Sequence, residues 1–515
     1  MSLNNQGRPT GLGTSSTARA NGSALLPNEP LLFEIGDTTH SGVDLPDVDC
    51  CDDDTLGGFG RQTPMDLAGL TEPEAMRHYV RLSRLNHSID SGMYPLGSCT
   101  MKHNPRLNEK TARLPGFSDI HPLQPLSSVQ GALELMSELS HWLMTLTNTS
   151  AVALTPKAGA HGELLGMMAI KAAQEARGQS GRKIVLVPES AHGTNPATAA
   201  FLGYGVKTIP ARQDGTVDVE AVQAALSPDV AAIMLTNPNT CGLFEPQVKA
   251  IADAVHAAGA FFYCDGANFN AIMGVVRPGD LGIDAMHINL HKTFSTPHGG
   301  GGPGAGPVVL SEALAPYAPV PFLRRNGDTI ELVEHQEGEA LGRVSAFHGQ
   351  MGMYVRALTY MLSHGRDGLA QAAKDAVLNA NYIRARLANV FSLPFPDHPS
   401  MHEVLFDDSF LQGTGVTTLD FAKRLIDEGF HPMTMYFPLV VHGAMLIEPT
   451  ESESKQTLDA FCDTMLELAE AAKHDAAPFT SAPERAPRRR LDETRAARSP
   501  ILRWQEPVDR PQAAE

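Results

Sequence analysis

The stretch NLHKTFSTPHGGGGPG, residues 289–304, places a histidine–lysine pair after an apolar segment and before four consecutive glycines. We expect a strand over His287–Leu290 that ends close to Lys292. Burial at a strand end favours the neutral amine of a lysine, which attacks carbonyl carbons, and glycines let the backbone approach a bound group. The pattern favours a Schiff-base lysine. A lysine that caps a strand and extends to solvent has the same local sequence.

Asp265, in the stretch YCDGANFN (263–270), follows the apolar run Ala260–Tyr263, which we expect to be a buried strand. The carboxyl ends of strands in an open α/β sheet border the crevice that binds ligands. We therefore expect Asp265 and Lys292 to face one cleft. An aspartate at a pyridine nitrogen and a lysine linked to an aldehyde are the groups that a pyridoxal phosphate (PLP) enzyme needs. An Asx-turn before Gly266 is the alternative for Asp265.

The stretch PKAGAHGELLGMMAI (156–170) is a candidate phosphate site. Gly159 and Ala160 precede an apolar helix that we expect to begin near Glu163. Helix N-termini bind phosphate through unpaired N–H groups and the positive end of the helix dipole. Glycine-rich helix starts are common, so the pattern gains weight only beside Asp265 and Lys292.

His192, in the stretch SAHGTNPATAA (190–200), follows the expected strand Ile184–Val187. At the carboxyl end of a strand, an imidazole can stack on a flat cofactor ring or move a proton. A hydrogen-bonded histidine in a turn is the competing interpretation.

Seven stretches of the chain resemble, in order, the glycine decarboxylase (P-protein) of the glycine cleavage system, and in particular the separate second subunit found in some bacteria and archaea. The resemblance runs from about residue 70 to about residue 475. The stretches are NHSIDSGMYPLGSCTMKHNPR (86–106), AGAHGELLGMMAI (158–170), SAHGTNPATA (190–199), TNPNTCGLFEP (236–246), CDGANFNAI (264–272), INLHKTFSTPHGGGGPG (288–304) and IEPTESESKQTLDAF (447–461).

The resemblance implies an α/β fold of the fold type I PLP-dependent transferase class, with a mostly parallel sheet in a large domain and a smaller C-terminal α+β domain. It also implies a role for individual residues. Lys292 would carry the cofactor and Asp265 would hold the ring nitrogen protonated. Ala267 would lie against one ring face and His192 would stack on the other. The remaining cofactor-binding residues assigned in this way are Gly159, Ala160 and Thr240.

The implied reaction is the decarboxylation of glycine with transfer of the aminomethyl group to the lipoyl disulfide of the H-protein, as in glycine dehydrogenase (aminomethyl-transferring). Fused members of the family are longer and contain two related halves. This chain has 515 residues and a single HisLys motif. We therefore expect the first half to be a separate polypeptide, subunit 1, in an assembly with two copies of each subunit.

Two other functions remain open at this point. One is a different fold type I PLP enzyme, such as a cysteine desulfurase, a threonine aldolase or an amino-acid decarboxylase, and the stretch MYPLGSCTMKHNP weighs against it. The other is a structural subunit without catalytic activity, and the presence of Lys292 and Asp265 argues against it.

Within MYPLGSCTMKHNP, Lys102 is suited to binding a carboxylate. A thiol-exchange role for Cys99 receives little weight, since a lone cysteine is more often a small buried side chain.

Composition excludes several classes of protein. A net charge of −18 argues against a nucleic-acid surface, which needs clustered lysine and arginine. There is no apolar run of transmembrane length, and MSLNNQGRPTGLG has no signal-peptide hydrophobic region, so we expect a cytoplasmic location and no membrane partner.

The six cysteines show no spacing typical of a disulfide framework. His291 and His298 lack the carboxylate neighbours of a metal site, and we expect no metal.

Changes in composition and in apolar periodicity divide the chain into segments. We predict a mostly disordered extension over 1–60, a helical segment with an active-site loop over 61–150, a PLP-binding large domain over 151–349, a small domain over 350–475 and a flexible tail over 476–515. The expected helices are 65–90, 129–147, 218–226, 246–258 and a long one that starts the small domain. Besides those named above, the expected strands are Val206–Ile209, Val230–Leu235, Val308–Leu310, Glu403–Phe406 and Ala444–Ile447.

Overall fold

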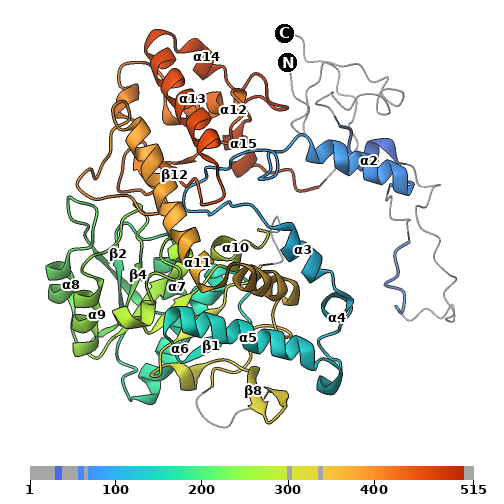
Figure 1. The fold of residues 1–515 in the computed structure, drawn as a ribbon, viewed down its shortest axis with the longest axis vertical. Helices are drawn as coiled ribbons and strands as arrows, with labels where there is room; N and C mark the ends of the chain where they lie inside the picture. The colour runs from blue at the N-terminus through green and yellow to red at the C-terminus, as the bar shows by residue number, and fades with distance from the viewer. Residues whose placement is uncertain (1–28, 37–55, 63–67, 299–303, 335–339, 504–515) are drawn as a thin grey trace. The chain divides into compact units, whose positions relative to one another are not determined.

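The computed structural model describes residues 29–36, 56–62, 68–298, 304–334 and 340–503 (Figure 1). Most of the predicted extension and the four glycines at 299–302 lie outside these ranges. The chain divides into two units, one of residues 1–88 with 481–515 and one of residues 89–480. The described elements of the first unit are α1 (Leu32–Ile35), α2 (Glu72–Ser83) and α15 (Glu493–Arg498).

A seven-stranded sheet forms the centre of the second unit, in the order β1-β7-β6-β5-β4-β2-β3. Strand β7 is antiparallel to both of its neighbours, and the pairs β6–β5, β5–β4, β4–β2 and β2–β3 are parallel. The strands are β1 (Ala151–Ala153), β2 (Ile184–Pro188), β3 (Gly205–Ile209), β4 (Val230–Thr236), β5 (Phe261–Asp265), β6 (Ala285–His287) and β7 (Val308–Leu310). The predicted mostly parallel sheet is confirmed.

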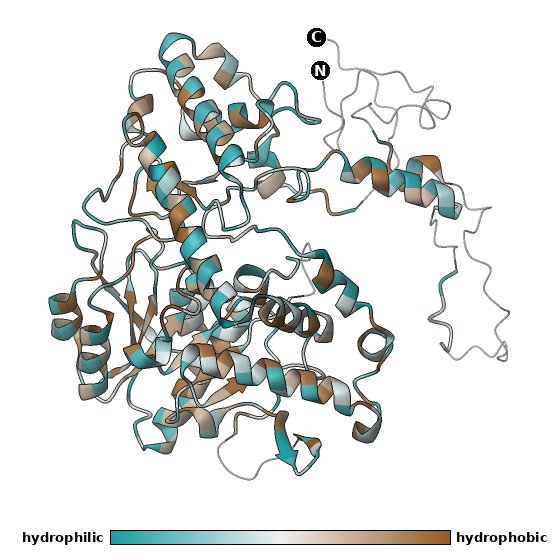
Figure 2. Ribbon diagram, viewed as in Figure 1, coloured by the Kyte–Doolittle hydropathy of each residue, from teal (hydrophilic) through white to brown (hydrophobic). Residues whose placement is uncertain are grey.

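Strands β4 and β5 show why the sheet is parallel and covered. Every residue of VAAIMLT in β4 and of FFYCD in β5 is buried, which is typical of parallel strands with helices on both faces. Figure 2 shows hydrophobic residues along these strands and mixed hydropathy on the surrounding helices. The helices before and between the strands are α3 (Arg106–Ala112), α4 (Pro115–Ser118), α5 (Gln130–Thr147), α6 (Gly159–Ala176), α7 (Thr194–Phe201), α8 (Val219–Ala225), α9 (Val248–Ala257) and α10 (Leu290–Thr293).

The C-terminal part of this unit begins with the long helix α11 (Met351–Leu387), which packs on both α3 and α13. This C-terminal part contains an antiparallel sheet in the order β10-β12-β11, and its hydrophobic core includes Phe391, Phe421 and Phe461. The elements are β10 (Val404–Phe406), α12 (Thr418–Asp427), β11 (Thr434–Met435), β12 (Met445–Ile447), α13 (Lys455–His474) and α14 (Ala477–Thr480). A separate hairpin joins β8 (Phe322–Asn326) to β9 (Thr329–Val333).

Three sequence predictions about element limits are wrong. The predicted strand His287–Leu290 is instead the end of β6 at His287 followed by α10, because the amides of Lys292 and Thr293 turn back to the carbonyl of Asn289. Helix α6 begins at Gly159, four residues before the predicted start at Glu163.

The third wrong limit concerns the helix predicted over 65–90. Helix α2 spans Glu72–Ser83, with a capping box between Thr71 and Glu74 at its start. Among the helices of the described residues, none is long and apolar enough to cross a membrane.

Candidate active site

Lys292 lies in the single turn of α10, directly after β6, rather than at the end of a strand. Its side chain is half-buried, and its Nζ donates a hydrogen bond to the carbonyl oxygen of Ser98 at 2.8 Å. Ser98 has a φ of 61°, a left-handed conformation that is uncommon for a residue with a side chain. The loop around Ser98, 194 residues earlier in the chain, therefore orients the amine.

Asp265 ends β5 and lies beside His287, which ends the neighbouring strand β6. The distance between Asp265 Oδ1 and His287 Nε2 is 3.4 Å, and both side chains are buried. His287 Nδ1 accepts a hydrogen bond from the hydroxyl of Tyr263 at 2.6 Å, and its Nε2 lies 3.0 Å from Asn289 Oδ1. This network assigns the proton of a neutral imidazole to Nε2.

The charges of Asp265 and Lys292 both act on His287. Burial lowers the pKa of His287, the charge of Asp265 opposes this shift, and the charge of Lys292 adds to it. Helix α10, which carries Lys292, packs against η2 (Gly266–Ala271), the turn that follows Asp265. The two residues that the sequence predicts to share a cleft therefore lie on neighbouring segments. Sequence reasoning placed His287 in a strand without a role. Its position at the carboxyl end of a buried strand was the available signal.

The start of α6 lies against the same residues. A Cβ at Gly159 would be 2.6 Å from Asn289 Nδ2 and 3.1 Å from His287 Nε2, so only glycine fits at this approach. Helix α6 has 18 residues, and no side chain among the described residues caps its N-terminus. Its first amides, from Gly159 and Ala160 onward, are thus available to an anion.

His192 lies in the loop between β2 and α7 and is connected to Glu163 through Thr194. Its Nδ1 is 3.0 Å from the hydroxyl oxygen of Thr194, and Thr194 donates a hydrogen bond to Glu163 Oε2 at 3.0 Å. Burial, together with the charge of Asp265, raises the pKa of Glu163 to about 7. The ring of His192 contacts that of Phe437 edge-on, with centroids 5.8 Å apart.

Two other predicted cofactor residues occupy loops at the same edge of the sheet. The backbone N–H of Ala267 donates to Asp265 Oδ1 at 2.9 Å, and Asp265 caps the turn that begins at Gly266. Thr240 is buried, and its hydroxyl donates to the carbonyl of Ser190. The loops after β2, β4 and β5 therefore meet at one edge, as parallel strands require.

The loop of residues 98–102 lies over Lys292. Cys99 Sγ is 3.8 Å from His298 Nδ1, and burial raises the pKa of the thiol. The rings of His291 and His298 lie 4.6 Å apart, and burial, with the neighbouring imidazole and the charge of Lys292, lowers the pKa of His291 to about 3. The three side chains around the amine are thus uncharged at neutral pH.

Lys102 is not free to grip a substrate carboxylate. Its Nζ donates to Glu451 Oε1 at 2.6 Å, to Asn270 Oδ1 at 2.8 Å and to the carbonyl of Thr293 at 2.8 Å, and the side chain is buried. Burial works against the charged form, but Glu451 and Tyr360 outweigh it, so the pKa of Lys102 is raised. This cation joins the loop to the end of α10.

A cluster that sequence reasoning missed consists of His402, Glu403 and Glu448, all fully buried. One nitrogen or oxygen atom of each lies within 4.8 Å of the others. Glu403 Oε2 accepts the N–H of Ser98 at 2.8 Å, and Glu448 Oε1 accepts the hydroxyl of Thr100 at 2.5 Å. The signal was weak, since Glu448 lies in a quoted stretch and Glu403 is the first residue of a predicted strand.

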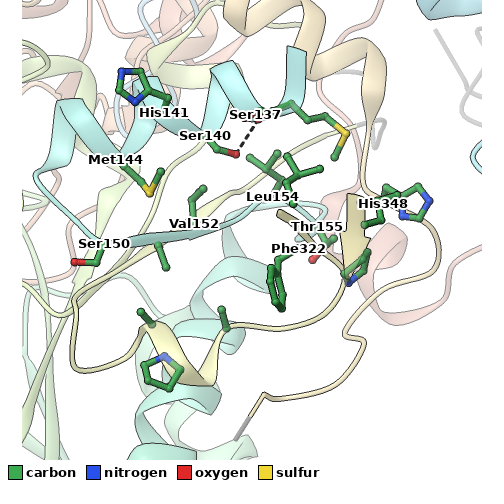
Figure 3. Close-up of a pocket in the computed structure, with 18 residues that line it drawn as sticks. Ser137, Ser140, His141, Met144, Ser150, Val152, Leu154, Thr155, Phe322 and His348 are labelled. Carbon is green, nitrogen blue, oxygen red and sulfur yellow. Dashed lines mark hydrogen bonds between the residues drawn. The ribbon is translucent and has the colours of Figure 1, made fainter. Parts of the chain in front are cut away.

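A cavity of about 570 Å³ opens elsewhere, between α5, β1 and the segment that leads into β8 (Figure 3). Its described lining contains no lysine, carboxylate or cysteine. Polar and aromatic groups that line it are those of Ser137, Ser140, His141, Ser150, Thr155, Phe322 and His348. None of the site residues described above lines this cavity.

Comparison with known proteins identifies the family. A model described as glycine dehydrogenase, C-terminal domain, matches residues 372–483, and one described as aminotransferase class-V matches residues 161–390. A protein of Caulobacter vibrioides named "Probable glycine dehydrogenase (decarboxylating) subunit 2" is 66% identical over 525 residues, covering 100% of both chains. A protein of Bacillus licheniformis with the same name is 49% identical over 482 residues, covering 93% of this chain and 99% of its own.

A solved structure has the same fold. The crystal structure of a glycine decarboxylase (P-protein) of the glycine cleavage system, in inhibitor-bound form, has a TM-score of 0.68 at 21% identity and covers 80% of this chain and 93% of its own. The predicted fold class and the resemblance noted in the sequence are confirmed. The chain belongs to the family of glycine dehydrogenase (decarboxylating) subunit 2.

Proposed function

We propose that this chain is the PLP-binding subunit of a glycine dehydrogenase that decarboxylates glycine and transfers the aminomethyl group to a lipoyl disulfide. The observation that carries the proposal is that Lys292 lies on α10, which packs against the turn after Asp265, in a member of this family. A silent structural subunit would have no need to keep an amine and a carboxylate in this arrangement.

The residues present fit the cofactor. Lys292 would bind its aldehyde and Asp265 would face its ring nitrogen. The start of α6, at Gly159 and Ala160, would receive the phosphate through backbone N–H groups, because the N-cap residue Ala158 makes no side-chain cap. When bound, PLP supplies a protonated pyridine ring that accepts the electron pair left as the glycine carboxylate departs as CO2.

The neighbouring residues orient these groups. The carbonyl of Ser98 directs the Lys292 amine, and the backbone N–H of Ala267 holds the Asp265 carboxylate. Neutral His287 lies beside Asp265, with Nε2 3.4 Å from Oδ1, and adds no positive charge there. We assign His192 the face of the ring, with Thr194 and Glu163 fixing its orientation. Thr240 holds the adjoining loop.

The overall reaction needs partners. One sulfur of the lipoyl disulfide of an H-protein takes the aminomethyl group, and the other leaves as a thiolate that gains a proton, so the disulfide is reduced as glycine loses CO2. The family name "subunit 2" supports a partner subunit 1. We propose two copies of each subunit and a cytoplasmic location.

Reductive trapping tests the cofactor assignment. The purified chain incubated with PLP should show a visible absorption band, and borohydride should remove the band and leave a pyridoxyl group on the peptide that contains Lys292, detected by mass spectrometry. K292A should show neither signal. Labelling of a different lysine would contradict the proposed site.

Carbon exchange between bicarbonate and glycine tests the reaction itself. Exchange should require this chain, subunit 1 and lipoylated H-protein together. Trapped cofactor without exchange under these conditions would point to another fold type I PLP enzyme. Exchange that persists with K292A would point to a structural subunit.

A further inference from the structure

Two buried glutamates lie side by side beneath the loop that holds Lys292. Glu403 directly precedes β10 and Glu448 directly follows β12. The two strands are antiparallel with Val404 opposite Ile447, so extending the register by one residue places Glu403 opposite Glu448. Both residues are 0% exposed. Two ionised carboxylates at such a position would repel each other without water to screen them.

Ser98 connects this pair to the active site. Its backbone N–H donates to Glu403 Oε2 at 2.8 Å, and its carbonyl accepts from Lys292 Nζ at 2.8 Å. The charge of Lys292 acts on both glutamates in the direction that favours their ionised forms. A hydrogen bond from an amide stabilises a carboxylate, so Glu403 is the member of the pair suited to carry the negative charge.

The second oxygen of each glutamate carboxyl group indicates the position of a proton. Glu403 Oε1 and Glu448 Oε2 are both buried and have no hydrogen-bond partner among the described residues. Buried polar atoms are rarely left unpaired. One oxygen of each carboxyl group lies within 4.8 Å of the other group, so a proton on Glu448 that is shared with Glu403 would supply a donor where none is present.

The pKa of Glu448 is raised further than that of Glu403, so Glu448 is the member of the pair suited to carry a proton. Burial is the main cause that raises the pKa of Glu448 well above its ordinary value, and Glu403 and Glu451 add to the shift. Burial raises the pKa of Glu403 only to about 7. Burial and the charge of Lys292 lower the pKa of His402 to about 3, so this ring is neutral.

The charges of the two glutamates also affect the pKa of two thiols. The charge of Glu448 acts on Cys99, and that of Glu403 acts on Cys241. Burial raises the pKa of both thiols, so neither contributes a charge at neutral pH. Lys292 therefore remains the positive charge to which the glutamate pair responds.

We propose that Glu403 and Glu448 share a single proton and act as positioning residues for Lys292, with the one remaining negative charge holding the N–H of Ser98, whose carbonyl accepts from the Lys292 amine. This rests on the proposed function, in which Lys292 carries the cofactor. Glu403 and Glu448 do not touch the reacting atoms and act through the Ser98 loop. The pair keeps the amine in place when the cofactor is not attached to it.

Infrared spectroscopy tests the shared proton without any need for cofactor. Protein labelled with ¹³C-glutamate should show the carboxylic-acid C=O band of a protonated buried glutamate at neutral pH, and E448Q should lose that component. The matched control is E453Q, in the same loop, where burial alone raises the pKa. A spectrum that E448Q leaves unchanged would overturn the shared proton.

Reductive trapping at a fixed pH tests the action on Lys292. E403Q removes the carboxylate that accepts the N–H of Ser98, so pyridoxyl labelling of Lys292 should slow several-fold. E448Q replaces an acid that is already neutral and should slow the labelling much less, and E453Q should leave it unchanged. An equal loss in E403Q and E448Q, or no loss in either, would refute the proposal.

Two further outcomes separate the alternatives. A stoichiometric divalent metal in the purified protein that H402A loses would show that a cation, not a proton, neutralises the pair, and would overturn the proposal. Absence of trapping at Lys292 in the unmodified chain would instead remove the proposed function, while the infrared band would still report on the proton. If E403Q does not fold, the infrared bands of the unmodified chain and of E448Q still decide whether the two glutamates share a proton.

Discussion

Replacing Lys102 by methionine should destabilise the second unit strongly. The Lys102 side chain is 2% exposed and its Nζ ion-pairs with Glu451 at 2.6 Å. It also donates to Asn270 and to the carbonyl of Thr293, the last residue of α10. Methionine fills a similar volume but offers no donor, so the substitution leaves a buried carboxylate without its cation.

The expected cost follows from the burial of Glu451. Removing one partner of a buried ion pair costs about 3–5 kcal/mol. The side chain of Glu451 is 12% exposed, so some water reaches it and the lower end, about 3 kcal/mol, applies. The measurement is the free energy of unfolding from equilibrium urea denaturation followed by circular dichroism.

A double-mutant cycle and a surface control complete the test. K102M combined with E451Q should be more stable than K102M alone, because no unpaired charge is left. K249M removes an exposed pair with Asp253 and should change the free energy of unfolding by less than about 0.5 kcal/mol. A cost for K102M of under about 1 kcal/mol, or an E451Q background that brings no recovery, would refute the reasoning.

Three other predictions test the packing, the chemistry and the pH dependence. G266A would place a Cβ 1.9 Å from the carbonyl oxygen at the end of β6, and should cost about 1–3 kcal/mol in urea unfolding, whereas G181A, with open space around it, should not. D265N should still be trapped by borohydride but should lose roughly 100-fold or more in bicarbonate exchange, because an amide cannot stabilise the ring proton; near-normal exchange would exclude the assigned role. The hydrogen bond to Asp284 raises the pKa of His256, so this stabilisation is complete below about pH 6.5 and is lost as pH rises through the raised value; H256Q should remove that slope from the melting temperature.

The sequence alone predicted the mostly parallel sheet. It also predicted that Asp265 lies at the carboxyl edge of that sheet. The continuous apolar runs of β4 and β5 have one stable environment, the buried centre of a parallel sheet, and the polar residue after such a run must lie at its carboxyl end. Asp265 and Lys292 were found in this way. The limits of β6 were not, because Ile288 and Leu290 suit both a strand and the turn that follows it.

The tertiary structure decided which distant groups meet. His287 pairs with Asp265, Glu403 lies opposite Glu448, and the partners of Lys102 include a residue 349 positions away. Local periodicity reports which face of an element is buried but not which element covers it. The free energy of a buried charge depends on the partner that the fold supplies, so these pairings emerge only when the chain is packed.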